Sequence, residues 1–225
     1  MFYNYKSRFS IILMAVVDAN YKFVYASAGT QGRVSEAGVF SHSDLRHAMD
    51  NGMLHFPPDD TLPGTDTIMP YMFIGDDAYP LRPDLMKPFP FRNLNSKQKI
   101  YNYRLSRARR IVENAFGILA YRFRVFRTTI CLDPDKVVTI VFPCLCLHNF
   151  LRNQRSEAYV PLGYVDSEDM NYQLVEGAWR REGALQSITM CQARNPSVEA
   201  KKQRNTLCQY FVSPAGSASW QEHMV

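Results

Sequence analysis

Apolar residues cluster in two short runs near the start of the chain, residues 9–17 (FSIILMAVV) and 21–28 (YKFVYASA). Both runs are rich in β-branched and aromatic residues, which favour strands. The residues between them, 18–20 (DAN), include two that favour turns. The pattern therefore predicts an antiparallel hairpin, with Asp18 as a turn former.

The next segment alternates between helical and loop patterns. Residues 29–54 contain apolar positions at helical spacing, and Ser35 or Ser43 can cap the helical turns. Residues 57–66 (PPDDTLPGTD) are dense in turn formers and predict a surface loop. A strand over residues 71–75 then ends at Asp76, and strand ends are common ligand sites in α/β folds.

Two long helices are predicted in the second half of the chain. The first begins near Ser96 and repeats apolar residues every three or four positions. The second covers residues 134–152, where Pro143 could introduce a kink and His148 is interpreted as a hydrogen-bonded core residue. Beyond residue 152 the pattern predicts a polar linker and then a docking helix within residues 193–212. We therefore divide the chain into residues 1–152 and residues 153–225.

Composition narrows the class of protein. The chain has 225 residues, of which 46% are hydrophobic, enough to bury a core. Its five cysteines are odd in number and lie in or near apolar runs, so we expect reduced thiols in a cytosolic or nuclear protein. Cys144, Cys146 and His148 lack a further ligand pair at zinc-site spacing, and we expect neither zinc, nor a membrane span, nor a signal peptide.

Positive charge is concentrated in one region. The net charge is +5, and residues 97–127 carry nine lysines and arginines but a single acid, Glu113. Such a cluster is an electrostatic footprint for a polyanion, although a solvated helix face has the same composition.

Two carboxylates stand out against this background. Asp76 ends the predicted strand and Glu113 lies within the basic helix. Carboxylate oxygens bind Mg²⁺ and arginines bind phosphate, so the pair suits a metal site that acts on a phosphodiester. An intrahelical ion pair of Glu113 with Arg109 or Arg110 is the structural alternative. Further candidate ligands are Asp77, Glu36 and Asp18, whereas phosphate-loop, dinucleotide and serine-hydrolase motifs are missing from the sequence.

Several longer strings, in this order, carry a resemblance to a known family: YKSRFSIILMAVVDANYKFVYASAGTQGRVSEAGVF, FIGDDAYPLRPDLMKPFP, NYRLSRARRIVENAFGILAYRFRVF and CLCLHNFLR. Together they resemble the DDE endonuclease domain of PIF/Harbinger transposases and the nucleases derived from them, over residues 3–152. Asp76 falls in the family's G-D-x-x-Y-P motif and Glu113 in its R-x-x-x-E-x-x-F-G motif. Glu36 falls on a further acid, where GRVSE replaces the family's G-S-x-x-D.

The resemblance implies an α/β fold of the RNase H-like type, with a mixed sheet flanked by helices, that holds Mg²⁺ or Mn²⁺ and cleaves DNA. Asp76 and Glu113 would be catalytic, and Asp76, Glu113 and Glu36 would be metal ligands. The family's first catalytic aspartate lies on a strand upstream of the matched segment, so we expect an incomplete acid set, an incomplete sheet and impaired activity. A non-catalytic DNA- or protein-interaction module is the alternative.

The resemblance also implies partners and a location. We expect DNA and a Myb-like DNA-binding protein as partners, and a nuclear location. We expect the protein to bind neither a membrane nor a small-molecule substrate. The residues expected to hold DNA phosphates are Arg104, Arg107, Arg109, Arg110, Arg122 and Arg124.

Overall fold

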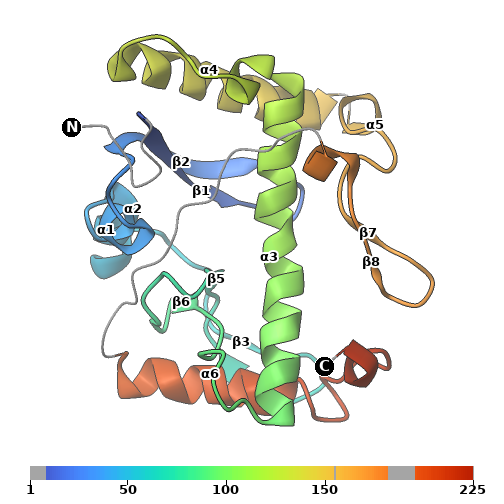
Figure 1. Cartoon of the computed structure of the whole chain (residues 1–225). Helices are drawn as coiled ribbons and strands as arrows, with labels where there is room; N and C mark the ends of the chain where they lie inside the picture. Colours follow the sequence, from blue (N-terminus) through green and yellow to red (C-terminus); the bar gives the residue numbers. More distant parts are fainter. Residues whose placement is uncertain (1–8, 155, 182–195, 225) are drawn as a thin grey trace. The chain divides into compact units, whose positions relative to one another are not determined.

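The structure is a computed structural model that describes residues 9–154, 156–181 and 196–224 (Figure 1). It has a mixed α/β architecture and divides into two compact units. The first unit combines Met1–Ser35 with Arg110–Thr189, and the second combines Glu36–Arg109 with Met190–Val225. Each unit thus joins two separate segments of the sequence. The domain boundary expected at residue 152 stays a prediction.

The first unit begins with the predicted hairpin. Strands β1 (Ile11–Val17) and β2 (Phe23–Gln31) pair in antiparallel register, and their turn is held by Asp18. The Asp18 carboxylate accepts hydrogen bonds from the backbone N–H groups of Asn20 (2.8 Å) and Lys22 (2.9 Å). Asp18 is therefore the turn former that the sequence predicted.

Helix α4 (Pro134–Gln154) lies across this hairpin (Figure 1). Its buried face, with Val141 and Leu145, packs with Phe23 of β2. Asn149 fixes the register, because its side chain bonds both the backbone N–H (2.9 Å) and the carbonyl (2.8 Å) of Phe23. Pro143 lies within the helix, which continues for three further turns.

His148 of α4 is fully buried, as the sequence predicted for a core residue. Its Nε2 bonds the carbonyl oxygen of Tyr21 at 2.7 Å, and its Nδ1 bonds the hydroxyl of Tyr159 at 3.0 Å. Burial lowers the pKa of His148, against a smaller opposing effect of the bond to Tyr21. Both ring nitrogens are thus committed to the core.

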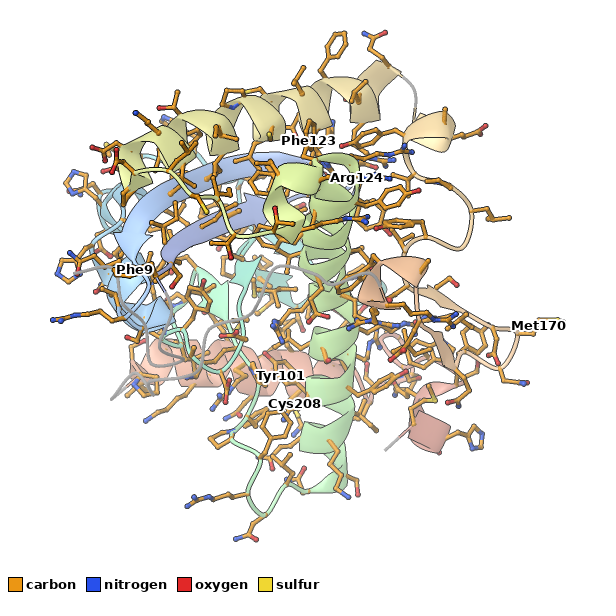
Figure 2. The ribbon with its side chains drawn as sticks, turned by 45° about the horizontal axis from the view of Figure 1, so that its top comes forward. Phe9, Tyr101, Phe123, Arg124, Met170 and Cys208 are labelled. Carbon is orange, nitrogen blue, oxygen red and sulfur yellow. The ribbon has the colours of Figure 1, made fainter. Side chains whose placement is uncertain are left out.

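The chain after α4 folds back onto the first unit through short elements. They are α5 (Ser156–Tyr159), the antiparallel strands β7 (Ser167–Glu168) and β8 (Leu174–Val175), and a 3-10 turn (Ala178–Arg181). Tyr159, Tyr164 and Trp179 of this region are buried in one cluster with Ile118. Met170, between the two strands, points into solvent (Figure 2). A region that was expected to be partly a polar linker therefore contributes core residues.

The second unit contains the remaining short elements. Its helices are α1 (Glu36–Ser41) and α2 (Asp44–Asp50), and its strands are β3 (Asp60–Thr61), β4 (Ile68–Met69), β5 (Phe73–Ile74) and β6 (Leu85–Met86). Ser43 caps α2 by accepting a hydrogen bond from Arg46 N–H at 3.1 Å, one of the two caps that the sequence offered. Strands β5 and β6 are parallel.

Helix α3 (Ser96–Arg122) begins at the residue where the sequence predicted it, and contributes to both units. In the second unit its Tyr101 and Leu105 pack against Cys208 of helix α6 (Val198–Tyr210). Figure 2 shows Tyr101 beside Cys208. Helix α6 lies within the range where a docking helix was expected, and the docking role stays a prediction. The chain's described part ends with a 3-10 turn, Gln221–Met224.

The strands of the described residues form four separate two-stranded sheets. The single mixed sheet of an RNase H-like fold stays a prediction. Four cysteines in the described part of the chain are free thiols, and Cys191 lies outside it. None of the described helices has the length and hydrophobicity to span a membrane.

Candidate functional site

Asp76 lies in the second unit, two residues after β5. Its Oδ1 accepts a hydrogen bond from Ala78 N–H at 2.9 Å, and its Oδ2 lies 3.7 Å from Nη2 of Arg109 on α3. The Asp76 side chain is about one quarter exposed, at 26%. One carboxylate oxygen thus shapes the local turn, while the other faces a guanidinium and remains accessible to solvent.

Gly75, the residue before Asp76, lies against the ring of Tyr79. A Cβ on Gly75 would lie 3.0 Å from Cδ2 of Tyr79, closer than ordinary side-chain contacts allow. Gly75 N–H also bonds the carbonyl of Met86 on β6 at 2.9 Å, so the parallel pair extends to the residue before Asp76. The site of Asp76 is therefore fixed by the strand and by a close ring contact.

A second cation lies near Asp76. Lys87 donates a hydrogen bond from Nζ to the carbonyl oxygen of Asp77 at 2.8 Å. Burial lowers the pKa of Lys87, while the charges of Asp77 and Asp76 oppose this effect. Asp76 and Asp77 thus lie close to a partly buried lysine.

Glu113 lies in the first unit on the second half of α3. Its Oε2 accepts a hydrogen bond from Nη2 of Arg180 at 3.1 Å, and its side chain is 40% exposed. The ion pair that the structure gives Glu113 is thus with a residue 67 positions away in sequence. The intrahelical alternative did not anticipate this partner.

Arg180 is held by a second, buried carboxylate. Its Nε donates to Oδ1 of Asp166 at 2.9 Å, and its Nη2 donates to Oδ2 at 2.5 Å. Asp166 also accepts a hydrogen bond from Gly177 N–H at 2.9 Å, and its side chain is 1% exposed. Burial by itself would raise the pKa of Asp166, but the bonds from Arg180 and Gly177 outweigh it, so the pKa is lowered.

The neighbouring residue on α3, Asn114, anchors the same segment. Its Oδ1 accepts hydrogen bonds from Asp166 N–H at 3.0 Å and from the indole Nε1 of Trp179 at 2.8 Å. The indole ring lies on Gly117, where a Cβ would come within 2.5 Å of Trp179 Cδ2. Gly117 is therefore required for the close approach of Trp179 to the helix.

Glu36 is the first residue of α1, as expected, but the placement of its side chain lies outside the described part of the structure. Asp76 and Glu36 belong to the second unit and Glu113 to the first. Among the described residues, no group of three or more His, Cys, Asp or Glu side chains could hold a metal ion. The assignment of Asp76, Glu113 and Glu36 to one metal site stays a prediction.

Three of the six arginines expected to bind DNA lie in the second unit. Arg109 faces Asp76, as described above. Arg104 donates to the carbonyl of Gly216 at 2.5 Å and stacks on Phe211, with 4.2 Å from Cζ to the ring centroid. Arg107 stacks on Trp220 at 3.8 Å. All three guanidinium groups thus contact other parts of the protein.

The other three arginines lie in the first unit. Arg110 forms an ion pair with Glu168 of β7 at 2.6 Å. Arg122, the last residue of α3, donates from Nε to the carbonyl of Tyr159 at 2.7 Å and from Nη2 to that of Ala158 at 2.7 Å. Arg124 follows the end of the helix and is exposed (Figure 2).

Sequence reasoning did not identify Asp166, Trp179 and Arg180 as parts of this site. Their segment lacks strong periodicity, and its elements are too short to be predicted from pattern. The composition of the segment gives one signal of a functional role. The string AWRR combines an aromatic residue with two arginines, and residues 166–176 before it contain four acids. That signal does not reveal which helix residue each of them contacts.

Comparisons with known proteins bear on this arrangement. A family model described as DDE superfamily endonuclease matches residues 1–149. The protein called Protein ALP1-like from Arabidopsis thaliana is 26% identical over 168 residues, which cover 74% of this chain and 41% of the relative. The chain thus spans less than half the length of that relative. No solved structure matches the chain.

Proposed function

Because the chain belongs to the DDE superfamily endonuclease family, we propose that it is a divalent-metal-dependent DNA endonuclease of the Harbinger transposase-derived type. The observation that carries this proposal is the family match over residues 1–149, which includes Asp76, Glu113 and Glu36. The match to Protein ALP1-like supports it. The family membership also confirms the resemblance found in the sequence.

The candidate ligands fit a hard divalent cation in their chemistry. Asp76 and Glu113 offer carboxylate oxygens and are both partly exposed, at 26% and 40%, so a hydrated ion can reach them. We assign Asp76, Glu113 and Glu36 as ligands of Mg²⁺ or Mn²⁺, with Asp76 and Glu113 catalytic. When bound, such ions activate a water nucleophile and stabilise the charge on the leaving oxygen.

The arginines of this chain would supply phosphate contacts. Phosphate binding by guanidinium groups is independent of base sequence and weakens with salt. Arg124 is exposed and the most available of the six, and Arg109 can turn from Asp76 to a phosphate because its side chain is 24% exposed. A Myb-like DNA-binding protein as partner and a nuclear location complete the proposal.

The test is a nicking assay on supercoiled DNA with the purified chain. We expect nicking that requires Mg²⁺ or Mn²⁺ and disappears in Asp76→Asn and in Glu113→Gln. Asp77→Asn is the matched control, because it removes a neighbouring charge that the proposal does not use. Nicking that survives both Asp76→Asn and Glu113→Gln would show that another protein or another site is responsible.

One observation favours a second function, a non-catalytic DNA- or protein-interaction module. Each of the two acids faces a guanidinium of the same chain, Asp76 that of Arg109 and Glu113 that of Arg180. In such a module these pairs would be structural. DNA binding that weakens with salt, without any metal-dependent nicking, would support this function over the nuclease.

A further inference from the structure

Arg180 occupies a position that the proposed nuclease would need for a metal ion. A single nitrogen, Nη2, donates both to Oε2 of Glu113 at 3.1 Å and to Oδ2 of Asp166 at 2.5 Å. A cation is therefore already bound between two carboxylates, and it belongs to the protein. It lies outside the residues that the family model matches, which end at 149.

The two carboxylates hold Arg180 unequally. Asp166 receives two hydrogen bonds in a fork arrangement, from Nε and Nη2, and is 1% exposed. Glu113 receives one bond and is 40% exposed. Forked bonds to a buried carboxylate are stronger than a single bond at a partly exposed one. Glu113 is thus the partner that can leave while Arg180 stays in place.

The segment that carries Arg180 is attached to α3 at several further points. Trp179 packs on Gly117 and bonds Asn114, and Glu168 pairs with Arg110. These contacts fix the backbone next to Arg180, so its guanidinium is presented to Glu113 at low entropic cost. Release of Glu113 breaks only its single bond to Arg180 and leaves the two bonds between Arg180 and Asp166 in place.

We propose that Arg180 is a built-in counter-ion that competes with a divalent cation for Glu113, so that the segment from Tyr164 to Arg181 regulates metal binding. The inference rests on the proposed function, since it takes Glu113 as a metal ligand. A metal ion and a guanidinium cannot both contact the same carboxylate oxygen without repulsion between like charges. Metal binding therefore displaces Arg180 from Glu113.

The test measures binding of Mn²⁺ to the full chain, from the electron paramagnetic resonance signal of free Mn²⁺. Arg180→Gln removes the competing charge, and Arg181→Gln is the matched control at the adjacent, exposed arginine. We expect Mn²⁺ affinity to rise roughly fivefold in Arg180→Gln, the size expected for loss of a partly exposed ion pair. Arg181→Gln should leave the Mn²⁺ affinity unchanged. Adding Glu113→Gln to Arg180→Gln should abolish the gain in Mn²⁺ affinity.

A second variant guards against misfolding. Arg180→Gln leaves the buried Asp166 without its guanidinium, which destabilises the segment. The double variant Asp166→Asn with Arg180→Gln pairs two neutral amides instead, and should show the same gain in Mn²⁺ affinity. Its thermal unfolding, compared with that of the unmodified chain, establishes that the fold is retained.

Trp179 reports on Arg180 directly. The Arg180 Cζ lies 4.5 Å from the Trp179 ring centroid, and the chain has two tryptophans. In a Trp220→Phe background, Mg²⁺ should therefore change the emission of Trp179 as Arg180 leaves Glu113. This change should be lost in Arg180→Gln.

The outcomes separate the inference from the function beneath it. A gain in Mn²⁺ affinity that depends on Glu113, with the Trp179 response, supports the inference. Binding that depends on Glu113 but is the same with and without Arg180 overturns the inference and leaves the nuclease proposal standing. Mn²⁺ binding that ignores Glu113 in every variant overturns both.

Discussion

Substitution of Gly117 by alanine tests whether the segment with Trp179 is docked on α3. In an exposed helix interior this change is stabilising, by about 1 kcal/mol, because alanine is the better helix former. Here a Cβ at position 117 would lie 2.5 Å from Cδ2 and 2.6 Å from Cγ of Trp179. Normal contact between carbon atoms begins near ~3.5 Å, so the indole ring must move by about 1 Å.

That movement has a calculable cost. Overpacking of this kind costs about 1–3 kcal/mol. The indole Nε1, bonded to Asn114 Oδ1 at 2.8 Å, would lose its partner in a buried site. An unpaired buried donor adds about 1–3 kcal/mol. After the helix gain of about 1 kcal/mol, Gly117→Ala should lower the free energy of unfolding by about 1–5 kcal/mol.

Urea denaturation followed by far-ultraviolet circular dichroism measures this free energy. The control is Trp179→Ala combined with Gly117→Ala, where the alanine at position 117 meets no ring. Relative to Trp179→Ala alone, the double variant should be more stable by about 1 kcal/mol. A stabilising effect of Gly117→Ala in the otherwise unmodified chain would refute the docked position of Trp179.

Three further predictions concern single residues or the whole chain. Because burial lowers the pKa of His148, protonation of its ring favours the unfolded chain. The free energy of unfolding, measured by urea denaturation, should therefore be constant above about pH 6.5 and fall below it. In His148→Gln the free energy of unfolding should fall less steeply with decreasing pH. Arg122→Gln removes bonds to two carbonyls and should cost about 1.5–3 kcal/mol in the same assay, whereas Arg124→Gln should change stability by less than about 0.5 kcal/mol. If all six arginines bound phosphates, the slope of log affinity for DNA against log salt concentration would be about −5. We expect a slope of about −2 when DNA binding is measured by fluorescence anisotropy at several salt concentrations. A measured slope of about −5 would show that the internal contacts of the arginines open when DNA binds.

Local structure could largely be predicted from the sequence. The hairpin, the start of α3 at Ser96 and helix α4 follow from periodicity within each segment. The core role of His148 also followed, because a lone histidine in an apolar helix needs hydrogen-bond partners. The identity of those partners, Tyr21 and Tyr159, did not follow, since both lie in distant segments.

The candidate site shows the same division between local and distant information. The motifs located Asp76 and Glu113, but their arginine partners were either unidentified, as with Arg180, or assigned to DNA, as with Arg109. Side-chain pairs that join distant segments leave no periodic signal in a single sequence. The resemblance places Gly117 at the end of the family's R-x-x-x-E-x-x-F-G motif, and the structure adds that Trp179, beyond residue 149, requires a glycine there.

The arginines illustrate why charge counts overestimate a nucleic-acid footprint. Arg104 and Arg122 bond backbone carbonyls, Arg110 an acid, and Arg107 an indole ring. A guanidinium has five N–H donors, so a residue committed to one internal bond retains donors for phosphate only if the remaining ones face solvent. In the proposed function, the partly exposed arginines would contact DNA through the donors that face solvent, and a larger movement would break contacts within their own units. In the proposed nuclease, electrostatic attraction would orient DNA through the accessible charges, and the ion pairs of Asp76 and Glu113 would determine whether these acids can bind metal.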